Sequence, residues 1–156
     1  MKLFSNSVKD TIVIGKAIAR SVKKGDIICL FGNLGSGKTV LTKGIAEGLG
    51  VNKRNIVSPS FVLLREYLKA SIPLFHFDLY RLKSPKDILN IGYEEYLFGD
   101  GLTVIEWADR LKSLKPEEFL SINLSVKSSS KRQLVFKANG KRHKELLREI
   151  HEDIIN

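Results

Sequence analysis

Disulfides and long apolar runs are both missing from this sequence of 156 residues. Cys29 is the only cysteine, so no intramolecular disulfide can form. The apolar run around it, Ile27–Phe31, is far too short to cross a bilayer. The first residues, Met1–Ser7, turn polar before the apolar region of a signal peptide develops. We therefore expect a reduced, cytoplasmic protein without a membrane segment.

Acidic residues are also scarce, because 17 Asp and Glu face 26 Lys and Arg, which gives a formal net charge of +9. Residues 127–144 carry most of this excess, since they include seven basic residues and no acid. Such a stretch can attract nucleic acid or an acidic protein surface. It can equally form a solvated hairpin and helix face, and the charge alone does not decide between these interpretations.

Disorder is excluded as the main state, because hydrophobic residues make up 43% of the chain and charged residues 28%. No repeat or Pro/Gly-rich linker divides the sequence. We therefore expect one domain over residues 1–156, with the basic hairpin and the C-terminal helix, about 120–156, as part of it.

Apolar periodicity and turn residues predict alternating helices and strands. Helices are predicted over 8–22 and 38–49, after Ser84, and in the C-terminal segment that contains Leu146, Leu147, Ile150 and Ile154. Strands are predicted over 27–31, 61–68, 74–79, 102–105, 120–126 and 133–138, the last two as a hairpin. This order indicates an α/β protein with a mixed sheet.

The strongest motif lies between the first predicted strand and the helix that follows it. It matches G-x-x-x-x-G-K-[ST] in full, with the residues Gly32, Asn33, Leu34, Gly35, Ser36, Gly37, Lys38 and Thr39. Glycines let successive backbone N–H groups point at phosphate oxygens, and the helix presents its positive end to them. Lys38 supplies charge for the β- and γ-phosphates, and Thr39 supplies a hydroxyl ligand for Mg²⁺.

This P-loop, in its strand–turn–helix context, predicts a single-domain P-loop nucleotide-binding fold of the α/β class. We expect its mixed parallel and antiparallel sheet to be flanked by helices. ATP is the expected nucleotide, because the only Asn-Lys pair, in Asn52–Asn55, lacks the Asp that reads guanine.

Two acids follow apolar strands and are candidates for the chemistry beside the loop. Glu106 ends the strand 102–105, and Asp78 ends or interrupts the strand that starts at Leu74. Acids at carboxyl ends of parallel strands point into the ligand crevice. One would hold Mg²⁺, directly or through water, and the other would orient the attacking water. The residues expected to act in catalysis are Lys38, Asp78 and Glu106.

Neighbouring residues allow less specific expectations. His76 lies two residues before Asp78 and could support the acids of the site, but we interpret it as a structural histidine. We interpret Cys29 as core, and Trp107 as a packing residue or an anchor for a partner protein. Arginines speed phosphoryl transfer, and the candidates in this chain are Arg65, Arg81 and Arg110, unless a partner supplies the group.

Four blocks of residues together resemble the bacterial TsaE family. They are Gly25-Asp26 leading into Gly32–Thr39, then Ser58–Phe61, His76–Leu82 and Ile105–Trp107. The blocks span about 25–107, and the last three are more specific than the P-loop. The family usually has Asp, Ala and Thr where this sequence has Asn33, Ser36 and Ser60, which leaves the P-loop glycines, lysine and threonine in place.

The resemblance implies an ATPase of weak intrinsic activity that binds ATP and Mg²⁺ and serves threonylcarbamoyladenosine formation in tRNA. It implies docking on the TsaB–TsaD pair, which performs the transfer while the ATP cycle supports repeated turnover. By position, Thr39 and Glu106 take the Mg²⁺, Asp78 senses the nucleotide or positions water, and Thr11 contacts the nucleotide. Ser58–Phe61 would be a switch-like loop, and the basic stretch 127–144 could lie near tRNA, near the nucleotide through Lys131 or Arg132, or in solvent.

Two other functions would use parts of the same sequence. A small-molecule P-loop kinase would share the loop, but it usually has an arginine-rich lid, and residues 83–100 contain no arginine. A tRNA-binding module that uses residues 127–144 would leave the complete P-loop without a role.

Overall fold

The computed structural model describes residues 1–58 and 62–155. Its strands are β1 (Lys2–Ser5), β2 (Ile27–Phe31), β3 (Leu64–Tyr67), β4 (Leu74–Asp78), β5 (Leu102–Glu106), β6 (Phe119–Val126) and β7 (Arg132–Asn139). Its α-helices are α1 (Val8–Ser21), α2 (Lys38–Gly48), α3 (Pro85–Asn90), α4 (Tyr93–Leu97) and α5 (Lys141–Ile155). Two 3₁₀ segments, η1 (Lys53–Asn55) and η2 (Ala108–Leu114), complete the described elements.

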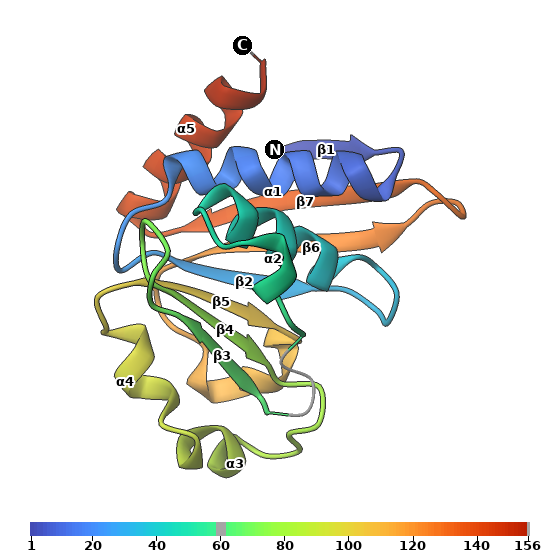
Figure 1. Cartoon of the computed structure of the whole chain (residues 1–156). Coiled ribbons are helices and arrows are strands. Elements are labelled where there is room, and N and C mark those ends of the chain that lie inside the picture. The colour runs from blue at the N-terminus through green and yellow to red at the C-terminus, as the bar shows by residue number, and fades with distance from the viewer. Residues whose placement is uncertain (59–61, 156) are drawn as a thin grey trace.

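The strands form one mixed sheet in the order β1-β7-β6-β2-β5-β4-β3. The four central strands, β6, β2, β5 and β4, are parallel to one another, whereas β7, β1 and β3 pair antiparallel at the two sides (Figure 1). The predicted single-domain α/β fold with a mixed, helix-flanked sheet is therefore confirmed. In the part of the chain that the structure describes, no helix is long and apolar enough to span a membrane.

Local sequence signals explain where the helices α1 and α3 begin. Ser7 caps α1 by accepting a hydrogen bond from the N–H of Asp10 at 3.1 Å, although Asp10 reaches back to Asn6 and not to Ser7. Ser84 and Asp87 form a complete capping box at α3, with Pro85 at its first position. The predicted helix after Ser84 is short, because a turn around Gly92 separates α3 from α4.

The edge strand β1 was not predicted, and the strand predicted over 61–68 begins at Leu64, with residues 59–61 outside the described part of the chain. Four residues are too few to display a period of two. β1 exists because it pairs with β7, with Leu3 opposite Leu134, far away in sequence. Its formation therefore depends on a tertiary contact that the local sequence does not contain.

The central strand β2 is buried on both faces, as its apolar run indicates. Ile28 and Leu30 belong to a core shared with α1, α2 and α5, whereas Ile27 and Cys29 belong to a second core, shared with α3, α4 and η2. Figure 1 shows α1 and α2 crossing one face of the sheet, with α5 beyond α1. Because β2, β5 and β4 are parallel neighbours, their carboxyl ends meet at one edge, where β2 leads into the P-loop.

Helices α1 and α2 pack unusually closely, and glycines make this approach possible. A Cβ added at Gly44 would lie 2.5 Å from the carbonyl oxygen of Ile12, and one at Gly15 would lie 2.6 Å from that of Leu41. Both obstacles are backbone atoms, so a larger residue would have to move a whole helix. Since α2 begins at the P-loop, this contact also fixes the loop relative to α1.

We predict that Gly44→Ala lowers the free energy of unfolding by about 1–3 kcal/mol, because overpacking outweighs the better helix propensity of alanine. Urea denaturation followed by circular dichroism measures the change. The control is Val13→Ala on the exposed side of α1, which should stay within about 0.5 kcal/mol of the parent. A Gly44→Ala protein as stable as the parent would refute this account of the helix contact.

Candidate nucleotide site

The P-loop has a backbone that only its glycines adopt without strain. Gly32, Gly35 and Gly37 have φ angles of 142°, 78° and 102°. At Gly32 a Cβ would also lie 2.4 Å from the carbonyl oxygen of Leu124 on β6, so this position tolerates no side chain. Gly37 is the N-cap residue of α2, and the free N–H groups of the first turn of α2 give this end a partial positive charge.

The buried Lys38 side chain folds back over the loop that carries it. Its Nζ donates to the carbonyl oxygens of Gly32 at 2.6 Å and Asn33 at 3.1 Å. The same ammonium lies 3.9 Å from the centre of the Trp107 ring. Burial lowers the pKa of Lys38, while the charges of Glu106, Asp78 and Asp109 oppose that shift. The positive charge is thus held by loop carbonyls and an indole face.

Glu106 is only 1% exposed, yet its carboxylate is well satisfied. Thr39 Oγ1 donates to Oε2 at 2.8 Å, whereas Oε1 accepts from His76 Nε2 at 2.7 Å and lies 3.3 Å from Thr42 Oγ1. Burial raises the pKa of Glu106, but the hydrogen bond and charge of His76, with the two hydroxyls, outweigh it and leave the pKa below its ordinary value. The site therefore contains an ionised carboxylate in contact with the P-loop threonine.

Asp78 lies beside Glu106, because the two are register partners on β4 and β5. Its Oδ1 accepts a hydrogen bond from the N–H of Tyr80 at 3.0 Å. Both acids line a cavity of about 260 Å³ together with the P-loop, Tyr80 and Trp107. The three residues expected to act in catalysis, Lys38, Asp78 and Glu106, thus converge on one cavity.

Trp107 lines this cavity and also packs against the core that β2 shares with α3, α4 and η2. Its backbone is left-handed, with φ 57°, at the N-cap of η2. Its ring lies 4.8 Å from that of Tyr80 and directly beneath Lys38. Trp107 therefore packs against the P-loop lysine and Tyr80, and a role as an anchor for a partner protein stays a prediction.

A second cavity, of about 340 Å³, lies on the other side of the loop and shares Gly35, Gly37 and Val40 with the first. Thr11 lines it, and its Oγ1 is 2.8 Å from Ser5 Oγ. Arg132, which sequence reasoning named only as one option for the basic stretch, also lines it and donates from Nη2 to the carbonyl oxygen of Gly35 at 3.4 Å. The tip of the β6–β7 hairpin therefore lies against the P-loop.

The other candidate residues are less central. Leu34 lines the first cavity but is largely exposed, while Ser36 is buried beneath the loop. Among the described residues, neither cavity beside the loop is lined by Arg65, Arg81 or Arg110. Of the predicted switch-like block, Pro59, Ser60 and Phe61 lie outside the described residues.

Comparison with known proteins agrees with this geometry. Residues 5–134 match the family described as "Threonylcarbamoyl adenosine biosynthesis protein TsaE". The chain belongs to the TsaE family. The match extends beyond the blocks at 25–107 in both directions, so it includes α1 with Thr11 and the hairpin with Arg132.

Individual TsaE proteins cover nearly the whole chain. The tRNA threonylcarbamoyladenosine biosynthesis protein TsaE of Bacillus subtilis is 37% identical over 150 residues, 95% of this chain and 93% of its own length. The protein of the same name from Treponema pallidum is 39% identical over 134 residues, covering 86% and 98% of the two chains. The crystal structure of Bacillus subtilis YdiB superposes with a TM-score of 0.83 at 34% identity, over 97% of this chain and 94% of that one.

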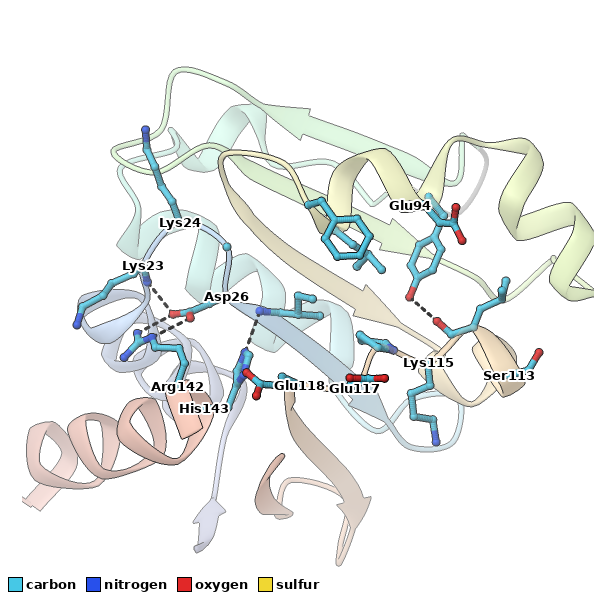
Figure 2. Close-up of a pocket in the computed structure, with 17 residues that line it drawn as sticks. Lys23, Lys24, Asp26, Glu94, Ser113, Lys115, Glu117, Glu118, Arg142 and His143 are labelled. Atoms are coloured by element: carbon cyan, nitrogen blue, oxygen red, sulfur yellow. Dashed lines mark hydrogen bonds and ion pairs between the residues drawn. The ribbon is translucent and has the colours of Figure 1, made fainter. Parts of the chain in front are cut away.

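A larger cavity of this TsaE-family chain, about 750 Å³, lies at the amino end of β2, opposite the P-loop. Figure 2 shows Arg142 and His143 at the start of α5 reaching Asp26 and Ile27. Arg142 binds both carboxylate oxygens of Asp26, at 2.7 and 2.9 Å, and His143 Nε2 accepts from the N–H of Ile27 at 3.1 Å. These contacts fasten α5 to the central strand.

His143 predicts a pH dependence of stability. Burial lowers its pKa, and Asp26 and Glu118 oppose this only in part. The unfolded chain then binds a proton at a higher pH than the folded chain, so stability is complete above about pH 6.5 and falls as the pH drops, by at most about 1.4 kcal/mol per unit for one proton. We predict that His143→Gln, which keeps an acceptor for Ile27, makes this decline between pH 6.5 and 5 shallower.

Urea denaturation at a series of pH values measures the effect. The matched control is His151→Gln on the exposed side of α5, which should leave the decline as steep as in the parent. Parallel curves for His143→Gln and the parent would assign the decline to another group.

Proposed function

We propose that this chain is a Mg²⁺-dependent ATPase of weak intrinsic activity that supports threonylcarbamoyladenosine formation in tRNA by docking on the TsaB–TsaD pair. Membership of the TsaE family supports the pathway. The observation that carries the enzymatic part is the convergence of Lys38, Thr39, Asp78 and Glu106 on one cavity at the P-loop. A structural module without ATP chemistry has no need for this combination.

The residues beside Thr39 fit a magnesium ion. Thr39 Oγ1 and Glu106 Oε2, 2.8 Å apart, are hard oxygen donors, and the pair is small enough for an ion that keeps waters and takes phosphate oxygens. Among the described residues, no group of three or more His, Cys, Asp and Glu side chains is arranged to hold a metal. When bound, Mg²⁺ would neutralise charge on the β- and γ-phosphates.

The two acids then take different roles. Glu106 Oε1 is engaged by His76, and Oε2 contacts the hydroxyl of Thr39, which is itself a proposed Mg²⁺ ligand. We therefore assign Glu106 to the ion. Asp78 lies next to it at the end of β4, and we assign it to the nucleotide or the attacking water. Lys38 would exchange its carbonyl acceptors for phosphate oxygens.

The two cavities beside the loop suggest how the nucleotide lies. The cavity with Lys38 and both acids would take the terminal phosphates. The cavity with Thr11 and Arg132 would take the nucleoside end, because it adjoins the same loop glycines from the other side. ATP remains the expected nucleotide, since the sequence lacks the motif that reads guanine.

The partner part of the proposal rests on the family and on what the site lacks. Arg132 lines the cavity proposed for the nucleoside end, whereas none of Arg65, Arg81 and Arg110 lines either described cavity at the loop, which favours an arginine supplied by a partner at the terminal phosphates. The basic stretch is not one free patch, because Arg132 contacts the loop and Arg142 is paired with Asp26. Contact with tRNA would fall to the exposed lysines Lys127, Lys137, Lys141 and Lys144.

The decisive test is Mg²⁺-dependent ATP hydrolysis with and without the purified TsaB–TsaD pair. We expect slow turnover that rises with the pair and falls by about a hundredfold or more in Lys38→Ala and Glu106→Ala. Controls of matched charge, Lys137→Ala and Glu117→Ala at exposed positions away from the loop, should behave like the parent. Turnover that ignores the pair, or survives in both site variants, would contradict the proposal and favour a kinase with a small-molecule acceptor.

Arg132 predicts a separate effect on nucleotide affinity. We expect Arg132→Ala to weaken binding of ATP and ADP by about tenfold, because one charged hydrogen-bond donor beside the loop is lost. Isothermal titration calorimetry measures the affinities. Lys127→Ala, on the same hairpin but exposed, should change them less than about twofold. Equal losses in both variants would mean that only the general charge of the hairpin matters.

A further inference from the structure

The two oxygens of Glu106 have different neighbours. Oε2 points to the P-loop and accepts from Thr39 at 2.8 Å. Oε1 points away from the loop, where His76 Nε2 lies 2.7 Å away and Thr42 Oγ1 3.3 Å away. His76, Thr42 and Glu106 are each at most 2% exposed, so water has little access to this arrangement. The carboxylate therefore has one face toward the loop and one face held by the protein interior.

The fold explains why these residues meet. His76 and Glu106 stand on parallel neighbours, with His76 opposite Val104 and Glu106 opposite Asp78, two residues further along both strands. Side chains two residues apart share a face of the sheet, and here that face is covered by α2. Thr42 lies on α2, one turn after Lys38, so it reaches the same carboxylate from the helix that covers this face of the sheet.

We infer that His76 is a positioning residue for Glu106: with Thr42 it holds Oε1, so that Oε2 alone is presented to the ion at Thr39. This inference rests on the proposed function of the site. A carboxylate fixed in this way offers one oxygen in one orientation, which suits the strict octahedral geometry of Mg²⁺. Hydrogen bonds to metal-binding side chains typically change metal affinity or activity by 10–100-fold.

The contact between Glu106 and His76 requires a hydrogen-bond donor on the imidazole ring. Glu106 Oε1 accepts, so His76 must carry hydrogen on Nε2. His76 Nδ1 is buried and has no hydrogen-bond partner among the described residues, so the second ring nitrogen adds no polar contact to the site. The amide of glutamine can place a donor near the same position, whereas leucine cannot. These two substitutions separate the hydrogen bond from the volume of the side chain.

The experiment compares the parent with His76→Leu, His76→Gln and Thr42→Val. Calorimetry measures binding of the non-hydrolysable analogue adenylyl imidodiphosphate without Mg²⁺ and over a Mg²⁺ titration. We expect His76→Leu to raise the Mg²⁺ concentration at half-effect by about 10–100-fold, with Mg²⁺-free affinity within about twofold of the parent. His76→Gln should stay within about threefold of the parent. Thr42→Val should shift the midpoint less than His76→Leu, because its hydroxyl also lies 3.0 Å from the carbonyl oxygen of Lys38.

Thr103→Val is the matched control, since Thr103 is buried on β5 but its hydroxyl donates to the carbonyl oxygen of Tyr96. It should leave the Mg²⁺ midpoint unchanged. A purely structural role for His76 would lower stability without moving the midpoint, so an unchanged midpoint in folded His76→Leu overturns the inference. A midpoint in His76→Gln as high as in His76→Leu overturns it as well.

Two further outcomes are distinguishable. If His76→Leu does not fold, a parent-like His76→Gln together with a raised midpoint in Thr42→Val supports the inference, and an unshifted Thr42→Val overturns it. If the parent itself binds the analogue without any response to Mg²⁺, the proposed function fails, and the inference fails with it. The inference alone fails when the parent responds to Mg²⁺ but the midpoint of His76→Leu equals that of the parent. It also fails when the midpoint of His76→Gln is raised as far as that of His76→Leu.

Discussion

The ionised carboxylate of Glu106 is the constraint on which much of this structure depends. A charge that is almost fully buried is tolerated only when donors replace its water, and here α2 and β4 supply them. The same hydrogen bonds therefore join the helix after the P-loop to two strands of the sheet. Removing the carboxylate would leave the donors of Thr39 and His76 without this acceptor. The contacts of Glu106 therefore belong both to the fold and to the candidate site.

The two ends of β2 have opposite characters. At the carboxyl end the chain turns into a loop whose glycines leave room for a ligand beside the backbone. At the amino end, Asp26 and the N–H of Ile27 are bound by Arg142 and His143 of α5. The carboxyl end therefore leads to the P-loop cavities, whereas at the amino end α5 binds the strand beside the larger cavity of about 750 Å³. This division explains why part of the basic stretch contributes to folding and not to a surface patch.

Features that depend on local sequence could be predicted. The P-loop, the buried strand before it and the capping box at Ser84 are each defined by residues within one short stretch of the chain. The positions of Asp78 and Glu106 followed from a general rule for the ends of parallel strands. The pairing of His76 with Glu106 could not be predicted, because it joins residues 30 positions apart and needs the register of β4 on β5.

Arg132 illustrates the same limit over a longer distance. It reaches Gly35 across 97 positions, and only the hairpin geometry of β6 and β7 brings its guanidinium to the loop. The sequence located the basic stretch and offered Lys131 or Arg132 for the nucleotide, but it did not choose between the nucleotide, tRNA and solvent. The structure separates the residues of the stretch by environment: one contacts the loop, one is paired with an acid, and several lysines are exposed. The net charge of the stretch therefore does not define a binding surface, because binding depends on which of its charges are not paired within the protein.

The balance of charge in the cavity is a physical argument for the proposed dependence on Mg²⁺. One ammonium, Lys38, faces two carboxylates, Asp78 and Glu106, so these three side chains together carry a net negative charge. A polyphosphate entering this cavity meets repulsion that the partial charge of the α2 N-terminus only partly offsets. A divalent cation held by Thr39 and Glu106 would offset this negative charge. Under the proposed function, the two carboxylates of the cavity, of which Glu106 would hold the ion, are thus also the reason why an anionic nucleotide would need it.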